Sequence, residues 1–91
     1  MYSYQIYSKN GMLKNYTWFE SLTDMLHHFL KHHIPEEATE IIFMYGWMEM
    51  ISYNPKEHIT QDITPGLYTD ISNLIKEYIR QKDEVLSNEK S

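Results

Sequence analysis

The chain has 91 residues, with 13 acidic and 8 basic side chains, a formal net charge of −5 and no cysteine. A chain of this length has enough interior for one hydrophobic core, so we expect a single domain. The negative balance argues against direct binding of nucleic acid, which needs a basic surface to meet the phosphates. Without cysteine there is no disulfide, thiolate metal site or thiol nucleophile, as is typical of a protein of the reducing cytoplasm.

Hydrophobic side chains make up 42% of the chain, which is enough for a folded protein. No apolar run approaches the roughly 18 residues that a membrane-spanning helix requires. The start Tyr2-Ser3-Tyr4-Gln5 also lacks the basic and apolar regions of a signal peptide. We therefore expect a cytoplasmic protein that does not bind a membrane.

Residues 2–19 predict a β-hairpin, because aromatic and aliphatic side chains alternate with polar ones on both sides of a central turn sequence. We predict a three-residue loop, Lys9-Asn10-Gly11, since a two-residue loop would mix the two faces. The three-residue loop gives two cross-strand pairs, Tyr4 with Tyr16 and Tyr2 with Trp18. One face of the hairpin then becomes aromatic, and we interpret that face as core.

Residues 21–33 predict the first helix. Ser21 is suited to cap its N-terminus, with Asp24 three residues later, and Pro35 prevents its continuation. The apolar residues at helical spacing form one face, which consists of Leu22, Met25, Leu26, Phe29 and Leu30.

Residues 39–53 predict a second hairpin with Gly46 and Trp47 in its turn, the order that a type II′ turn favours. In that register Phe43 lies opposite Met50. A single long strand with a bulge at Gly46 and a helix over residues 36–44 remain as alternatives.

A polar loop is expected over residues 54–64. Thr64 followed by Pro65 then indicates the start of a second helix, whose apolar positions run from Leu67 to Ile79. We expect residues 87–91 to form a frayed tail.

These elements predict an α+β fold of order ββαββα, in which a four-stranded antiparallel sheet packs both helices on one face. The domain covers residues 1–86. If both helices share a face, part of the second hairpin points away from them, together with the residue at its turn. The residues expected to be exposed in this way are Ile42, Met44, Trp47, Ile51 and Tyr53.

An open sheet face is ordinarily polar, so an apolar one indicates a surface that binds another protein. The alternative is that the 54–64 loop or a different strand order covers these side chains. The partner would be a host protein or a second copy of the chain, which would form a homodimer.

Four histidines gather on the first helix, and His28 and His32 are spaced to reach one metal ion. His58 is the nearest candidate for a third ligand, although the sequence does not fix its position. A metal-binding or pH-responsive role for these three residues is therefore the first alternative function.

No other sequence pattern predicts a catalytic or cofactor-binding site. The sequence has no glycine-flanked serine, no phosphate-binding glycine loop and no dinucleotide motif, so we expect neither an enzyme nor a cofactor. The composition is typical of a small accessory protein encoded by a phage or mobile element, for instance a regulator, adaptor or inhibitor. A second alternative is an acidic inhibitor of a host nucleic-acid enzyme, using Glu36, Glu37 and Glu40 to occupy its basic site.

Overall fold

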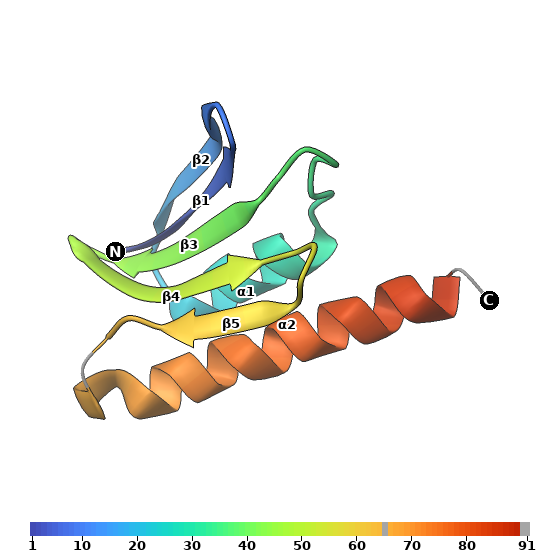
Figure 1. Cartoon of the computed structure of the whole chain (residues 1–91). Coiled ribbons are helices and arrows are strands. Elements are labelled where there is room, and N and C mark those ends of the chain that lie inside the picture. The colour runs from blue at the N-terminus through green and yellow to red at the C-terminus, as the bar shows by residue number, and fades with distance from the viewer. Residues whose placement is uncertain (65, 90–91) are drawn as a thin grey trace.

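The computed structural model describes residues 1–64 and 66–89, which form five antiparallel strands and two α-helices (Figure 1). In chain order the elements are β1 (Tyr2–Ser8), β2 (Gly11–Phe19), α1 (Leu22–Lys31), β3 (Glu40–Tyr45), β4 (Met48–Asn54), β5 (Ile59–Asp62), the short 3-10 helix η1 (Gly66–Tyr68) and α2 (Thr69–Glu89). The strands are arranged in the order β2-β1-β3-β4-β5. The predicted α+β class is confirmed, whereas the predicted number of four strands is wrong.

The additional strand, β5, lies within the segment that we expected to be a loop. The Asn54 side chain accepts hydrogen bonds from the backbone N–H groups of Lys56 and Glu57, at 2.9 and 3.3 Å, and so turns the chain back beside β4. β5 then pairs with β4 along its whole length. Most of its side chains are exposed, so it lacks the apolar alternation by which a strand is recognised in a sequence.

The β1–β2 hairpin differs from the prediction at its loop. Ser8 pairs with Gly11, so two residues rather than three form the loop. Leu13 is then an extra residue in β2, and this bulge restores the predicted pairing of Tyr4 with Tyr16.

The β3–β4 hairpin turns at Gly46 and Trp47, as predicted. Its register shifts by one residue shortly after the turn, because Met50 is an extra residue in β4. Phe43 therefore pairs with Ile51 and not with Met50, so the predicted register is wrong beyond this bulge.

Both helices lie on the same face of the sheet. The ring of Tyr53, in β4, packs edge-on against Phe29 of α1, while its hydroxyl donates to Asp83 of α2. Phe29 also meets the rings of Tyr4 and Phe43 at 5.6 and 5.0 Å. The buried core combines residues of this sheet face with residues of both helices, namely Tyr4, Ile6, Met25, Leu26, Phe29, Ala38, Ile41, Phe43, Met50, Ile51, Tyr53, Ile75 and Ile79.

Helix α1 begins as the sequence predicts. The Ser21 hydroxyl accepts a hydrogen bond from the backbone N–H of Asp24 at 3.1 Å, which confirms its role as the N-cap. The helix ends at Lys31, two residues before the predicted end.

Helix α2 begins later than predicted, at Thr69, after the 3-10 helix η1. Thr64 does not cap it, because its hydroxyl lies 3.2 Å from the Ser72 hydroxyl and 3.3 Å from a carbonyl of β4. The predicted first helical residue, Pro65, lies outside the described residues. The helix extends to Glu89 and so includes part of the segment expected to fray, whereas residues 90 and 91 are not described.

Candidate functional site

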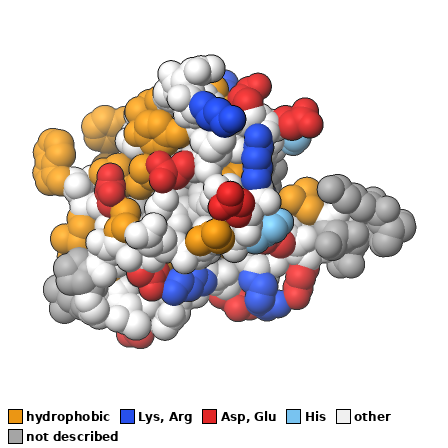
Figure 2. Space-filling view, viewed as in Figure 1, with side chains coloured by type: hydrophobic (Ala, Val, Ile, Leu, Met, Phe, Trp, Pro, Cys, Tyr) orange, Lys and Arg blue, Asp and Glu red, His pale blue; other side chains and the backbone are white. Residues whose placement is uncertain are grey.

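An apolar pocket lies at one end of the sheet, with both tryptophans of the chain among its lining residues. Its volume is about 410 Å³. It is lined by Met1, Tyr2, Ser3, Thr17, Trp18, Gly46 and Trp47, which we call the tryptophan end. Trp47 is 99% exposed and Trp18 is 78% exposed. In Figure 2 apolar side chains gather on the left of the molecule, where Figure 1 places the β3–β4 turn and the N-terminus.

Trp47 is exposed because of its place in the β3–β4 turn. Gly46, the residue before it, has a φ of 59°, which glycine adopts without steric cost and which the first position of a type II′ turn requires. The Gly46 N–H donates to the carbonyl of Met1 at 2.8 Å and so ties the turn to the start of β1. The turn is anchored by its backbone, and the indole is left in water.

Trp18 is exposed because of a second bulge in β2. Thr17 and Trp18 together lie opposite Ser3, and Trp18 has a φ of 74°. A left-handed backbone is strained for a bulky residue and costs of order 1–3 kcal/mol. Phe19 takes the place opposite Tyr2 that was predicted for Trp18. The predicted position of Trp18 on the aromatic core face is therefore wrong.

The structure places three of the five predicted binding residues on the expected side. Trp47 lies at the turn, while Ile42 and Met44 are half-buried on the face that points away from the helices. Ile51 and Tyr53 are buried against the helices instead, at 0% and 4% exposure, so their expected exposure is wrong. The bulge in β4 is the reason, because one extra residue moves every later side chain to the opposite face.

The sheet face that points away from the helices is largely polar. Ile42 lies between Gln5 and Ser52, and the neighbouring row of side chains includes Glu49. This face resembles the solvated side of an ordinary antiparallel sheet, rather than the continuous apolar surface that we expected. The two most exposed large apolar side chains among the described residues, Trp47 and Trp18, lie at the tryptophan end.

Sequence reasoning missed the contribution of β1 and β2 to this site. Tyr2 packs against the core as predicted, but Trp18 was assigned there too, and alternation of side chains gives no sign of a bulge. The one available signal was that Trp18 lies near the end of its strand, where pairing is most easily displaced.

Two histidines at the C-terminal end of α1, His28 and the C-cap residue His32, belong to an aromatic cluster with two tyrosines. The His28 and His32 rings stack at 4.9 Å. The Tyr4 hydroxyl hydrogen-bonds with Nδ1 of His28 at 2.6 Å, and the Tyr16 hydroxyl with Nε2 of His32. Each imidazole therefore already has a protein partner at one ring nitrogen.

The pKa of His32 is lowered from its ordinary value, mainly by burial and further by the nearby charges of His28, Lys82, Lys14 and His33. His58, the third metal candidate, bonds instead with a residue of α2. Among residues 1–64 and 66–89 no three histidine or carboxylate side chains gather closely enough to hold a metal ion.

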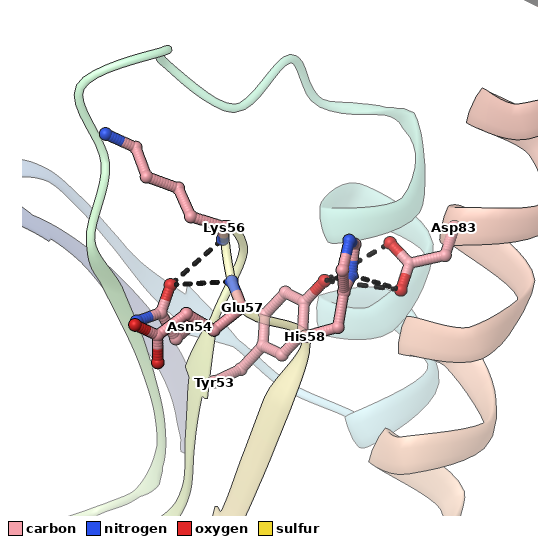
Figure 3. A network of polar contacts seen from close by, with 6 residues as sticks. All are labelled: Tyr53, Asn54, Lys56, Glu57, His58 and Asp83. Carbon is pink, nitrogen blue, oxygen red and sulfur yellow. Dashed lines mark hydrogen bonds and ion pairs between the residues drawn. The ribbon is translucent and has the colours of Figure 1, made fainter.

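A second pocket, of about 460 Å³, lies at the opposite end of β4 and is lined by polar and apolar residues. Figure 3 shows its polar network, in which Nδ1 of His58 lies 2.9 Å from a carboxylate oxygen of Asp83. The Tyr53 hydroxyl donates to the other oxygen of Asp83 at 3.2 Å. Burial, together with the negative charge of Asp83, raises the pKa of Tyr53. These contacts tie the β4–β5 turn to α2.

Lys82 completes this region, which we call the polar end: Tyr53, His58, Lys82 and Asp83. The Lys82 ammonium donates to the carbonyl of Phe29 and, at 2.7 Å, to that of His32. These carbonyls lie at the C-terminus of α1, where a cation is favourable. Burial lowers the pKa of Lys82 to about 8. Because its donors and acceptors are paired with one another, we interpret the polar end as a structural tie.

The acidic residues considered for nucleic-acid mimicry do not form a row. Glu36 and Glu37 lie in the turn before β3, and the Glu40 carboxylate accepts a hydrogen bond from Ser52 at 2.9 Å. Glu37 lines a pocket together with Lys9 and Lys56, so the charge there is mixed. This arrangement does not favour an acidic surface that replaces nucleic acid.

Comparisons with protein-family models, curated proteins and solved structures find no match to this chain. Within the described residues, no helix combines the length and the apolar character needed to span a membrane. The functional argument therefore depends on the geometry of the two ends of the sheet.

Proposed function

We propose that this protein is a small binding protein that contacts another protein through the tryptophan end. The observation that carries the proposal is the near-complete exposure of Trp47 beside Trp18 at one apolar pocket. Tryptophan is enriched among the residues that contribute most to protein interfaces, and each buries about 150–250 Å² when covered. Exposed apolar surface of this kind is typical of an interaction site.

The backbone at Trp18 supports the same proposal. A non-glycine residue with positive φ is retained where the surrounding structure holds it, and such strain is frequent at binding sites. Here the strain turns an indole outward that the pattern of the strand would otherwise bury. Because this strain lowers the free energy of unfolding, we expect the exposed indole to serve a function.

Charge favours a partner with a basic surface. The chain has a net charge of −5, and none of the residues of the tryptophan end has a basic side chain. Glu49 lies two strands from Ser3 in the same row of side chains, so a carboxylate stands on the same face of the sheet. Opposite charge would steer a basic partner to this surface.

Site-directed photo-crosslinking tests the proposal. A photoreactive amino acid at position 47 should cross-link discrete partner proteins in the native host, and the Trp18→Ala change should abolish these products. The matched control is the same amino acid at position 59, because Ile59 is also exposed, at 58%, but lies in β5 beside the polar end. Equal products from both positions, or products that persist without Trp18, would contradict the proposal.

The fold must survive a replacement at position 47 for the test to be valid. Because Trp47 is 99% exposed, Trp47→Ala should alter the free energy of unfolding by no more than about 0.5 kcal/mol. Denaturant unfolding monitored by circular dichroism measures this. A large loss of stability would mean that the indole belongs to the fold.

A further inference from the structure

We infer that the tryptophan end binds a proline-rich segment in the polyproline II conformation, with a basic residue about three positions from the bound prolines. This inference rests on the proposed function and specifies the chemistry of its partner. It follows from three features of the site: the hydrogen bonds that its backbone already makes, the chemistry of the lining side chains and the position of Glu49.

The backbone at the site is unsuited to the addition of a partner strand. Ser3 lies in β1, which is already paired with β2 and β3 on its two sides. The Gly46 N–H is used by the Met1 carbonyl. β2 is an edge strand, but the left-handed conformation of Trp18 interrupts the regular spacing of its free N–H and C=O groups. A partner must therefore be recognised mainly by side chains.

The lining side chains suit a polyproline II segment. Such a segment has no internal hydrogen bonds, so its carbonyls remain available and its rings need flat apolar surfaces. Trp18 and Trp47 provide exposed aromatic faces, and each indole has one N–H donor for a carbonyl. An amphipathic helix would instead need a groove long enough for side chains spread over two or more turns. A pocket of about 410 Å³ lined by seven residues is too small for that.

The position of Glu49 predicts where the basic residue lies. Ser3 pairs with Met44, and Met44 pairs with Glu49, so the carboxylate stands two strands from Ser3 in the same row. Two strand spacings amount to about 10 Å. A polyproline II segment rises about 3.1 Å per residue, so a basic residue about three positions from the pocket would reach Glu49.

Charge also argues against a second copy of the chain as the occupant. Two copies would each bring a net charge of −5. The two acidic chains would repel each other as they approached through the tryptophan end. A basic segment has the complementary charge.

Tryptophan fluorescence measures binding directly, because the only two tryptophans of the chain both line the pocket. The probe is a synthetic proline-rich peptide with one arginine three residues from its last proline. We expect a saturable blue shift of the emission as the peptide covers the indoles. Two matched peptides are titrated beside it, one with glutamate in place of arginine and one with alanine in place of the prolines.

Three variants separate the contributions. Trp47→Ala should weaken binding at least about tenfold, with Trp18 remaining as the reporter. Glu49→Gln should weaken binding of the arginine peptide about threefold and leave binding of the glutamate peptide no weaker than before. The control is Glu57→Gln, since Glu57 is equally exposed but lies in the β4–β5 turn, and its affinity should not change.

The outcomes distinguish this inference from the proposed function. Binding of the alanine peptide as tightly as the proline peptide, or no binding of either, overturns the inference. If crosslinking from position 47 nevertheless depends on Trp18, the proposed function stands with another protein as occupant. A blue shift that appears on concentrating the protein alone, together with a doubled mass in solution, would identify a second copy and overturn the inference as well.

Discussion

The two ends of strand β4 use their side chains in opposite ways. At the polar end, Tyr53, His58 and Asp83 bond with one another, and the Lys82 ammonium is paired with carbonyls of α1. At the tryptophan end, the backbone is anchored but Trp47 is left in water.

The side chains of the polar end thus stabilise the fold, whereas we propose that those of the tryptophan end recognise a partner. Among the described residues, every buried side-chain nitrogen and oxygen has a hydrogen-bond partner. At the polar end, the side chains of Tyr53, His58, Lys82 and Asp83 therefore bond with other groups of the chain itself. The most exposed apolar side chains, Trp47 and Trp18, lie at the other end, where they face water. The following predictions test this separation, from the largest expected effect to the smallest.

Phe29→Ala should have the largest effect on stability. The Phe29 ring is fully buried among Tyr4, Phe43 and Tyr53, so its removal leaves a cavity between α1 and the sheet. We expect a loss of about 3–5 kcal/mol in the free energy of unfolding, measured by urea denaturation. A loss below about 1 kcal/mol would mean that α1 does not hold the sheet as described.

Lys82→Met should cost about 1–3 kcal/mol, because the variant keeps most of the apolar length of the side chain but leaves the Phe29 and His32 carbonyls without the ammonium. The matched control is Lys76→Met. Lys76 forms an exposed ion pair with Asp62, and such pairs contribute about 0–1 kcal/mol. Equal losses in the two variants would contradict the structural role of Lys82.

Trp18→Gly and Trp18→Ala form a matched pair that isolates the backbone strain at the tryptophan end. Both changes remove the indole, but only glycine adopts a φ of 74° without steric cost. The glycine variant should be more stable than the alanine variant by about 0.5–1 kcal/mol, after the greater chain entropy of glycine is taken into account. Thermal unfolding of the two variants measures the difference. A more stable alanine variant would show that Trp18 is not strained.

The smallest effect is expected with pH, because His32 is only partly buried. Its pKa is lowered in the folded chain, so the unfolded chain binds a proton more readily. Stability should therefore fall as the pH decreases through the ordinary histidine pKa of about 6.5, and be recovered above it.

The melting temperature between pH 8 and pH 5.5 measures this dependence. His32→Gln should flatten it, whereas His27→Gln should not, since His27 is exposed and its ring lies beside Tyr78 of α2, apart from the His32 cluster. A melting temperature that rises on acidification would contradict the lowered pKa of His32.

Local signals in the sequence were sufficient for much of the fold. Ser21 identified the start of α1, and Gly46-Trp47 identified the turn of the second hairpin, because each acts through its own backbone neighbours. β5 was missed because its pairing depends on the turn at Asn54 and on the free edge of β4, and not on its own side chains.

The candidate site was predicted only in part, and the bulges explain why. Trp47 could be predicted to be exposed, since a turn residue has few neighbours whatever the register of its strands. Trp18, Ile51 and Tyr53 were assigned to the wrong face, because an extra residue in β2 or β4 reverses every side chain that follows it. A bulge is fixed by pairing across the sheet, which is not visible in one strand alone.

Acrylamide quenching of the tryptophan fluorescence, excited at wavelengths that tyrosine does not absorb, tests the central claim most directly, because it then reports on Trp18 and Trp47 alone. A neutral quencher avoids repulsion by the nearby carboxylates. If both indoles are left in water by the fold, the dilute folded protein should be quenched nearly as efficiently as the protein unfolded in urea. Strong protection in the dilute folded protein, lost on unfolding, would show that the chain covers its own tryptophans and would contradict the account.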